Sequence, residues 1–189
     1  GTIEVDFQNY SNWQDKAIYL EKGQYIKFLS EDFEVIQLQF PQEHIYHSED
    51  VRVLFKHLIS LGYIDLNECQ KCQQFLKDSI FSGNLDKILD ISKDQWFWQN
   101  PFRAQKAEYQ VIFDLKDIID LEYPHEFNSA RLTTVLHTKG VNVNHLVRSK
   151  LGLTVSSLLA NKRALESKRG IAFTDKSIQE IAYETGFKD

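Results

Sequence analysis

Several polar side chains are predicted to project from one short helix in the second half of the chain. Asn142 is a good helix-capping residue, and the apolar residues after it recur at the spacing of a buried helix face, which predicts a helix over 143–151. Its outward residues are Asn144, His145, Arg148 and Lys150. Asparagine and arginine can pair with the edges of adenine and guanine, and lysine neutralises phosphate. Asn142 and these four are therefore candidate DNA contacts, although an ordinary solvated polar face would contain similar residues.

The two cysteines are a second group that could do chemistry. Cys69 and Cys72 could complete a zinc site with His44 and His47, because zinc takes four such ligands, or they could act as a redox pair. A helix would also place Cys72 on its apolar face with Cys69 beside it. Two cysteines do not form a disulfide framework of the secreted kind. We expect structural cysteines, no bound metal and no cofactor.

The densest aromatic cluster is Trp96-Phe97-Trp98, with Phe102 close behind. Tryptophan is enriched in ligand and partner patches, so such a patch is one interpretation. The other, which we favour, is a loop pinned to the core by its aromatic side chains.

Charge divides the chain into two parts of opposite sign, although the whole carries −5. Residues 1–128 contain 12 Lys and Arg against 22 Asp and Glu, whereas residues 129–189 contain 10 against 5. A basic segment joined to an acidic one is typical of a nucleic-acid module attached to a sensing module. Random variation between two surfaces is the alternative. The length allows one domain or two small ones, and we place the boundary at 128/129.

The last sixteen residues, 174–189, predict the start of a helix-turn-helix. Ser177 and Glu180 have the spacing of a capping box, so a helix begins at Ser177 with Ile178, Ile181 and Ala182 facing inward. Gly186 can adopt the positive φ of a sharp turn, and Phe187 is the apolar residue that packs the turn against the helix.

The pattern I-x-E-I-A-x-x-x-G-F-x-D over 178–189, preceded by F-T-D, resembles the second DNA-binding motif of AraC-type transcription regulators. In that family a second recognition helix follows the residue equivalent to Asp189. The chain has no methionine and opens on Gly1, so we expect it to be part of a longer protein.

The resemblance implies two helix-turn-helix units joined by a long helix. It places the first unit on helices 129–136 and 143–151, and the connecting helix on 155–173. Arg163 on the connecting helix joins the candidate DNA-binding residues. Two registers remain open for the first recognition helix, one anchored on Val141 and one on Gly152. Gly170 replaces the leucine usual in the family. The two recognition helices would enter major-groove turns about 34 Å apart.

The N-terminal residues alternate as strands do. Strands are predicted over 2–7, 17–20 and 33–40, with a turn at 22–24. The last of these resembles the end of the cupin-type sensor barrel of AraC-like regulators. The two-histidine, one-glutamate metal signature of cupins is absent from this stretch, which disfavours a metal-dependent cupin enzyme.

From Asp50 the apolar spacing changes to that of helices. Helices are predicted over 51–59, 72–80, 85–89 and 108–123. Their apolar faces exceed what one small barrel can cover, so we expect a homodimer through this region.

The sequence therefore predicts an α+β protein with a partial cupin-like portion and an all-α bipartite helix-turn-helix domain whose second unit is incomplete. We expect a cytoplasmic regulator, not an enzyme, that binds double-stranded DNA and responds to an unknown small-molecule effector. No apolar run approaches a membrane span. The alternative is a cupin-related ligand-binding or enzyme fragment with a helical tail for protein contacts.

Overall fold

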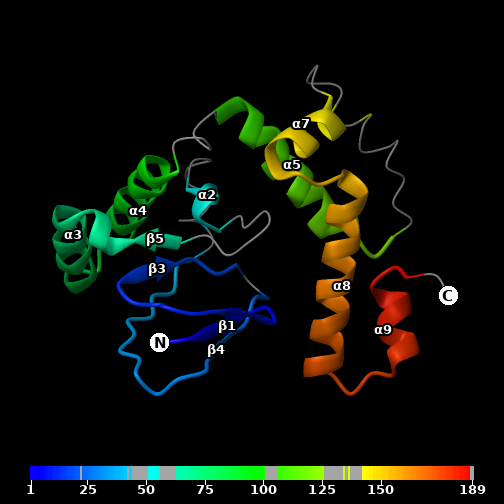
Figure 1. The fold of residues 1–189 in the computed structure, drawn as a ribbon, viewed down its shortest axis with the longest axis horizontal. Coiled ribbons are helices and arrows are strands. Elements are labelled where there is room, and N and C mark those ends of the chain that lie inside the picture. The colour runs from blue at the N-terminus through cyan, green and yellow to red at the C-terminus, as the bar shows by residue number, and fades with distance from the viewer. Residues whose placement is uncertain are drawn as a thin grey trace. The chain divides into compact units, whose positions relative to one another are not determined.

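The computed structural model describes residues 1–21, 23–41, 43, 51–55, 63–100, 106–125, 134, 136 and 142–187. The chain divides into two compact units, Gly1–Ala104 and Gln105–Asp189. The expected boundary at 128/129 lies outside the described residues, and the helix of residues 106–122, which we expected in the first portion, belongs to the second unit (Figure 1).

The first unit begins with a three-stranded antiparallel sheet. Its strands are β1 (Ile3–Val5), β2 (Gln8–Tyr10) and β4 (Ile26–Phe28), in the order β2-β1-β4. The strand predicted over 2–7 ends early because Asp6 and Phe7 form a two-residue hairpin loop, with φ of 49° and 66°. This conformation is costly for residues with a side chain, and Tyr25 supports it by accepting a hydrogen bond from the Phe7 N–H at 2.9 Å.

A second, two-stranded sheet pairs β3 (Lys16–Ile18) with β5 (Tyr63–Asp65) antiparallel. The strand predicted over 33–40 is wrong, because this segment has no ladder partner among the described residues. Val35 and Ile36 are 54% and 66% exposed, so the alternating pattern there does not reflect a buried sheet face. The strand of this region is β4 instead, in the sequence directly after the predicted turn.

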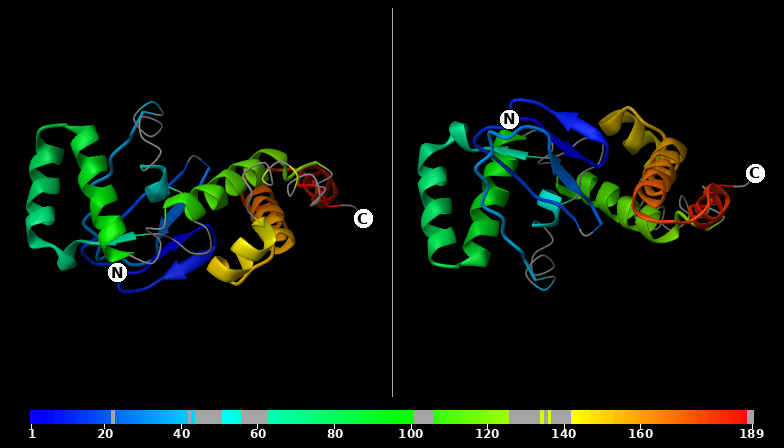
Figure 2. Two further views of the ribbon diagram at one scale, coloured as in Figure 1. Left: turned by 90° about the horizontal axis from the view of Figure 1, so that it is seen from above. Right: turned by 90° about the horizontal axis from the view of Figure 1, so that it is seen from below.

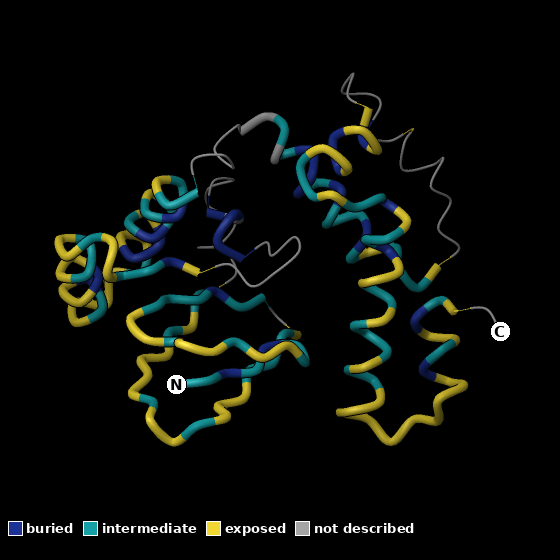
Figure 3. Tube along the Cα trace, in the orientation of Figure 1, coloured by how far each residue is buried: buried dark blue, intermediate teal, exposed yellow. Residues whose placement is uncertain are grey.

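The helices of the first unit are α2 (Arg52–Phe55), the short 3₁₀ helix η1 (Leu66–Glu68), α3 (Gln70–Phe81) and α4 (Leu85–Gln99). Residues 56–59 of the first predicted helix lie outside the described part of the chain. Gly83, with φ of 67°, turns α3 into α4, and the two helices lie side by side (Figure 2). Val53, Leu54 and Phe55 of α2 are buried (Figure 3).

The aromatic cluster at 96–98 lies in a helix and not in a loop. Helix α4 extends through it to Gln99, ten residues beyond the predicted end. Trp96 is buried at 5% exposure, whereas Trp98 is 60% exposed, because residues two apart on a helix face different directions. One tryptophan thus fills the core and the other lies on the surface. Phe102 is not among the described residues.

A buried polar pair joins the segment after β3 to α4. The Tyr19 hydroxyl hydrogen-bonds to Ser92 Oγ, and the two residues are 8% and 0% exposed. Burial raises the pKa of Tyr19 to about 12. The Tyr19 ring also contacts Phe55 of α2 edge to face, so one side chain links three elements of the first unit.

The second unit contains the helices α5 (Lys106–Glu122), α7 (Val143–Leu151), α8 (Val155–Phe173) and α9 (Ile178–Glu184). The predicted bounds of α7 and α8 are confirmed, as is the fourth predicted helix. The predicted capping box of Ser177 and Glu180 is present. Residues 129–133 and 135 of the predicted first helix lie outside the described residues, and Leu136 is buried.

Helix α9 packs along α8 at Gly170, and the turn after α9 meets the end of α5 at Gly186. Ile181 packs against Gly170, where an added Cβ would lie 3.0 Å from Ile181 Cγ2, so the absence of a side chain at Gly170 makes room for the α9 side chain. Gly186 has φ of 81°, and an added Cβ would lie 2.8 Å from the carbonyl oxygens of Tyr123 and Pro124 at the end of α5. Ile178, expected to face inward, is 76% exposed.

Helices and small antiparallel sheets together confirm the α+β class. Among the described residues, no helix combines the length and the apolar character needed to cross a membrane.

We predict strong coupling between Tyr19 and Ser92. Tyr19→Phe and Ser92→Ala each remove the buried Tyr19–Ser92 hydrogen bond, which costs about 1–3 kcal/mol, and the double variant should cost less than the sum. Urea unfolding followed by tryptophan fluorescence measures this in the first unit, which contains all three tryptophans. Additive losses in the double variant would refute the coupling.

We also predict that Gly186→Ala destabilises the second unit more than Gly152→Ala does. Both glycines have positive φ, which costs alanine about 1–2 kcal/mol, but an added Cβ at Gly152 meets no atom within 4 Å. The Cβ at Gly186 meets two backbone oxygens, so α9 must shift. Hydrogen exchange of the α9 amides should accelerate only in Gly186→Ala. Equal exchange in the two variants would contradict the proposed crowding.

Candidate nucleic-acid interface

Helix α7 has an exposed polar face, and its opposite, apolar face is buried. Val143, Leu146 and Val147 are 2%, 5% and 0% exposed, so the inner face is fixed in the core. Asn144, His145, Arg148 and Ser149 are exposed on the opposite face. The side chains of Asn144, His145 and Arg148 make no hydrogen bond or ion pair with other described residues. Their donors and acceptors are therefore available to a ligand.

Asn142 acts as the N-cap of α7. Its Oδ1 accepts a hydrogen bond from the His145 N–H at 3.0 Å, and Gly152 ends the helix in the left-handed conformation. The cap fixes the first turn, which contains Asn144 and His145. The amide N–H₂ group of Asn142 takes no part in this cap and can make an external contact.

Lys150 lies at the end of α7 and pairs with α5. Its Nζ is 2.5 Å from Glu108 Oε2, and the two side chains are 24% and 45% exposed. This charge contact reduces the positive potential that Lys150 can offer to a phosphate. No sequence signal indicated the pair, because 42 residues separate the partners.

Arg163 points to the carboxyl end of α5. Its Nε donates to the Tyr123 carbonyl and its Nη2 to the His125 carbonyl, each at 2.9 Å. These carbonyls follow the last turn of a helix, where backbone oxygens have no helical partner. The structure thus places Arg163 in a capping role between α8 and α5.

A charge network also links α5 to α8. Lys162 Nζ lies 3.0 Å from Asp120 and 2.8 Å from Glu166, and Arg169 binds the same Glu166 at 2.7 Å. Partial burial raises the pKa of Asp120, but the charges of Lys116 and Lys162 outweigh it and hold this pKa below its usual value. Partial burial likewise lowers the pKa of Lys162, but Glu166 and Asp120 raise it above its usual value.

The C-terminal unit is less basic than the sequence division at residue 128 suggested. The compact unit 105–189 contains 12 Lys and Arg against 11 Asp and Glu, a net charge of +1, because α5 brings its acidic residues into it. Lys116 and Asp120 have the i,i+4 spacing of a helix pair and could have been paired from sequence. The Lys162–Asp120 pair has no local signal.

The predicted capping box and turn are present at the two ends of α9. Ser177 Oγ accepts from the Glu180 N–H, and Glu180 Oε2 accepts from the Ser177 N–H; the bonds from Ser177 lower the pKa of Glu180. At the other end, the Phe187 N–H donates to the Ala182 carbonyl and the Gly186 N–H to the Tyr183 carbonyl. This is the expected glycine-ended turn.

The alternative zinc site would combine two histidines with two cysteines. His44 and His47 lie outside the described residues. Cys69 and Cys72 are joined by a disulfide, with their Cα atoms 5.3 Å apart. The sequence analysis left a redox pair open as an alternative but did not favour it. Where the structure describes the chain, no group of three or more His, Cys, Asp and Glu side chains could hold a metal ion.

We predict that Asp120 contributes to stability only while it is ionised. Its lowered pKa means that the contribution is present above its unfolded-state value, about 3.9, and is lost as the pH falls through the lower folded-state value. Asp120→Asn should reduce the melting temperature at neutral pH, and the difference from the original chain should shrink in acid. Asp175→Asn, on the exposed turn before α9, is the matched control. An Asp120→Asn deficit that stays constant with pH would refute the prediction.

Comparisons with protein-family models, with curated proteins and with solved structures give no match for this chain.

Proposed function

We propose that the chain is part of a sequence-specific, double-stranded-DNA-binding transcription regulator of AraC type, with α7 as a major-groove reader. One observation carries the proposal: α7 exposes Asn144, His145 and Arg148 with free polar groups while its opposite face is buried. A reading helix needs both properties, because base recognition requires uncommitted donors and acceptors on a rigid support.

The spacing of two of these residues suits neighbouring bases. Asn144 and Arg148 are four residues apart, which is about 6 Å along a helix and close to two base-pair steps of about 3.4 Å each. Arginine can bond guanine O6 and N7 together, and asparagine can bond adenine N6 and N7. We assign base contacts to these two residues and an accessory contact to His145.

The other candidate residues receive supporting roles. Asn142 caps α7 and can offer its amide group to a phosphate. Lys150 can reach a phosphate only by exchanging its contact with Glu108. Arg163 holds the end of α5 and is not assigned a DNA contact.

The bipartite plan is also supported by α8 and α9. Helix α8 has 19 residues, which corresponds to about 28 Å, near the repeat of about 34 Å between successive major-groove turns. Helix α9 and the Gly186 turn form the beginning of a second helix-turn-helix. By the same resemblance, the first unit would be a cupin-like effector sensor, and homodimerisation through helices of region 50–123 remains a prediction.

The test uses the chain as it is, with variants that remove one side chain each. Duplexes are selected from a random-sequence pool, and their affinities are then measured by fluorescence anisotropy at two salt concentrations. Arg148→Ala and Asn144→Ala each remove one base contact. Lys77→Ala is the matched control, because it removes an exposed positive charge from α3 in the first unit.

We expect Arg148→Ala to weaken binding to the selected duplex by about 5- to 150-fold, which corresponds to about 1–3 kcal/mol, and to relax selection at one base position. Asn144→Ala should relax selection at a nearby position. Lys77→Ala should leave both affinity and selection unchanged. The proposal fails if no sequence is enriched, or if Arg148→Ala and Lys77→Ala weaken binding equally.

A further inference from the structure

We propose that Cys69 and Cys72 form a reversible dithiol–disulfide pair that exchanges with small-molecule thiols and disulfides, and that Cys69 is the attacking sulfur. This activity is separate from DNA binding, and it lies in the first unit, so either proposal can fail without the other.

The two cysteines lie at the amino end of a long helix. Cys69 is the N-cap of the twelve-residue helix α3, and its Sγ accepts a hydrogen bond from the Cys72 N–H at 3.3 Å. A thiolate at this position gains from the unpaired N–H groups and from the positive end of the helix dipole. The helix therefore favours the reactive form of Cys69 when the pair is reduced.

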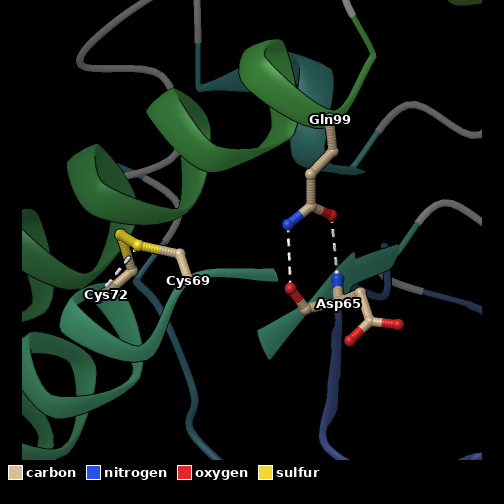
Figure 4. Close-up of a disulfide and its surroundings, with 4 residues drawn as sticks. All are labelled: Asp65, Cys69, Cys72 and Gln99. Carbon is tan, nitrogen blue, oxygen red and sulfur yellow. Dashed lines mark hydrogen bonds between the residues drawn. A yellow bond between two sulfur atoms is a disulfide. The ribbon is translucent and has the colours of Figure 1, made fainter. Parts of the chain in front are cut away.

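The segment that leads into α3 is fixed without the disulfide. Gln99 of α4 donates to the Asp65 carbonyl at 2.8 Å and accepts from the Asp65 N–H at 2.9 Å, so it pairs with both backbone groups of one residue (Figure 4). The Leu66 N–H donates to the Asp15 carbonyl at 2.8 Å. Opening the bridge would leave these bonds in place.

The disulfide also adds little as a structural crosslink. Three positions separate its cysteines, and the stabilisation from a crosslink is smallest for the shortest loops. Helix α3 is held along its length by α4, with Leu76 and Ser79 buried. Both cysteines are only half-buried, so a small thiol can approach them.

Atoms and electrons balance in this exchange with only the protein dithiol and one small disulfide as reactants. The Cys69 thiolate attacks one sulfur of a small disulfide such as oxidised glutathione, forms a mixed disulfide and releases one thiolate. The Cys72 thiolate then attacks Cys69 Sγ, closes the protein disulfide and releases the second thiolate. The protein loses two electrons and two protons, and the small disulfide becomes two thiols. Reduction runs through the same steps in reverse.

The first test equilibrates the full chain with glutathione buffers of graded oxidation state. Free thiols are trapped with a maleimide and counted by mass, while circular dichroism follows the helices. We expect both cysteines to open and close together and reversibly, with the helical signal retained. The proposal is wrong if the bridge opens only in denaturant or if its opening unfolds the first unit.

The second test compares two single variants with Ellman's reagent at neutral pH. Cys72→Ser leaves Cys69 at the N-cap with the backbone donor of position 72, whereas Cys69→Ser leaves Cys72 in the first turn and restores a good cap. Tryptophan fluorescence checks that both variants are folded. We expect Cys69 to react about three- to tenfold faster than Cys72, because more of it is thiolate. Equal rates, or a faster Cys72, would overturn the assignment of Cys69.

Discussion

The carboxyl end of α5 imposes the central constraint on the second unit. The last carbonyls of a helix have no partner within it, and leaving such groups buried and unbonded is costly. Arg163 of α8 donates to the carbonyls of Tyr123 and His125. Gly186, in the turn after α9, lies against the carbonyl oxygens of Tyr123 and Pro124. Three helices thus meet at one short stretch, residues 123–125. The position of α9 follows from it, since only a residue without a Cβ can approach these oxygens so closely.

This constraint separates polar residues that support the fold from those that are free to bind. Arg163 and Lys162 look like surface cations in the sequence, but Arg163 bonds the Tyr123 carbonyl at the end of α5 and Lys162 pairs with Asp120 of α5. Asn144 and Arg148 are exposed on a helix whose inner face is buried. The proposal of DNA reading rests on that difference, because a guanidinium that is held by two backbone carbonyls is not free to turn toward a guanine.

In the first unit, too, a side chain from one helix bonds backbone groups of another segment. Gln99 pairs with both backbone groups of Asp65 and so fixes the entry to α3 from the end of α4. The adjacent disulfide lies on a helix that is already held by its packing. These contacts do not involve the disulfide, which is the basis of the proposed exchange.

The helices of the second unit could be predicted from the sequence because their signals are local. Asn142, Thr154 and Ser177 each bond a backbone N–H three residues ahead, and Gly152 and Gly186 end their helices at positive φ. The polar face of α7 follows from the same periodicity. Each of these features involves residues within one or two turns.

Tertiary structure decided everything that depends on partners far along the chain. The alternating residues 33–40 look like a strand, but a strand needs a neighbour, and β1 pairs with β2 and β4 instead. Trp96 to Trp98 continue α4 because Trp96 fills the core. Lys150 pairs with Glu108, and Arg163 bonds backbone carbonyls about forty residues away, although both were predicted to contact DNA. The sequence by itself determined where most helices begin and end, because caps and periodicity act between near neighbours. Only the folded chain decided which charges remain free, because that depends on which distant segments meet.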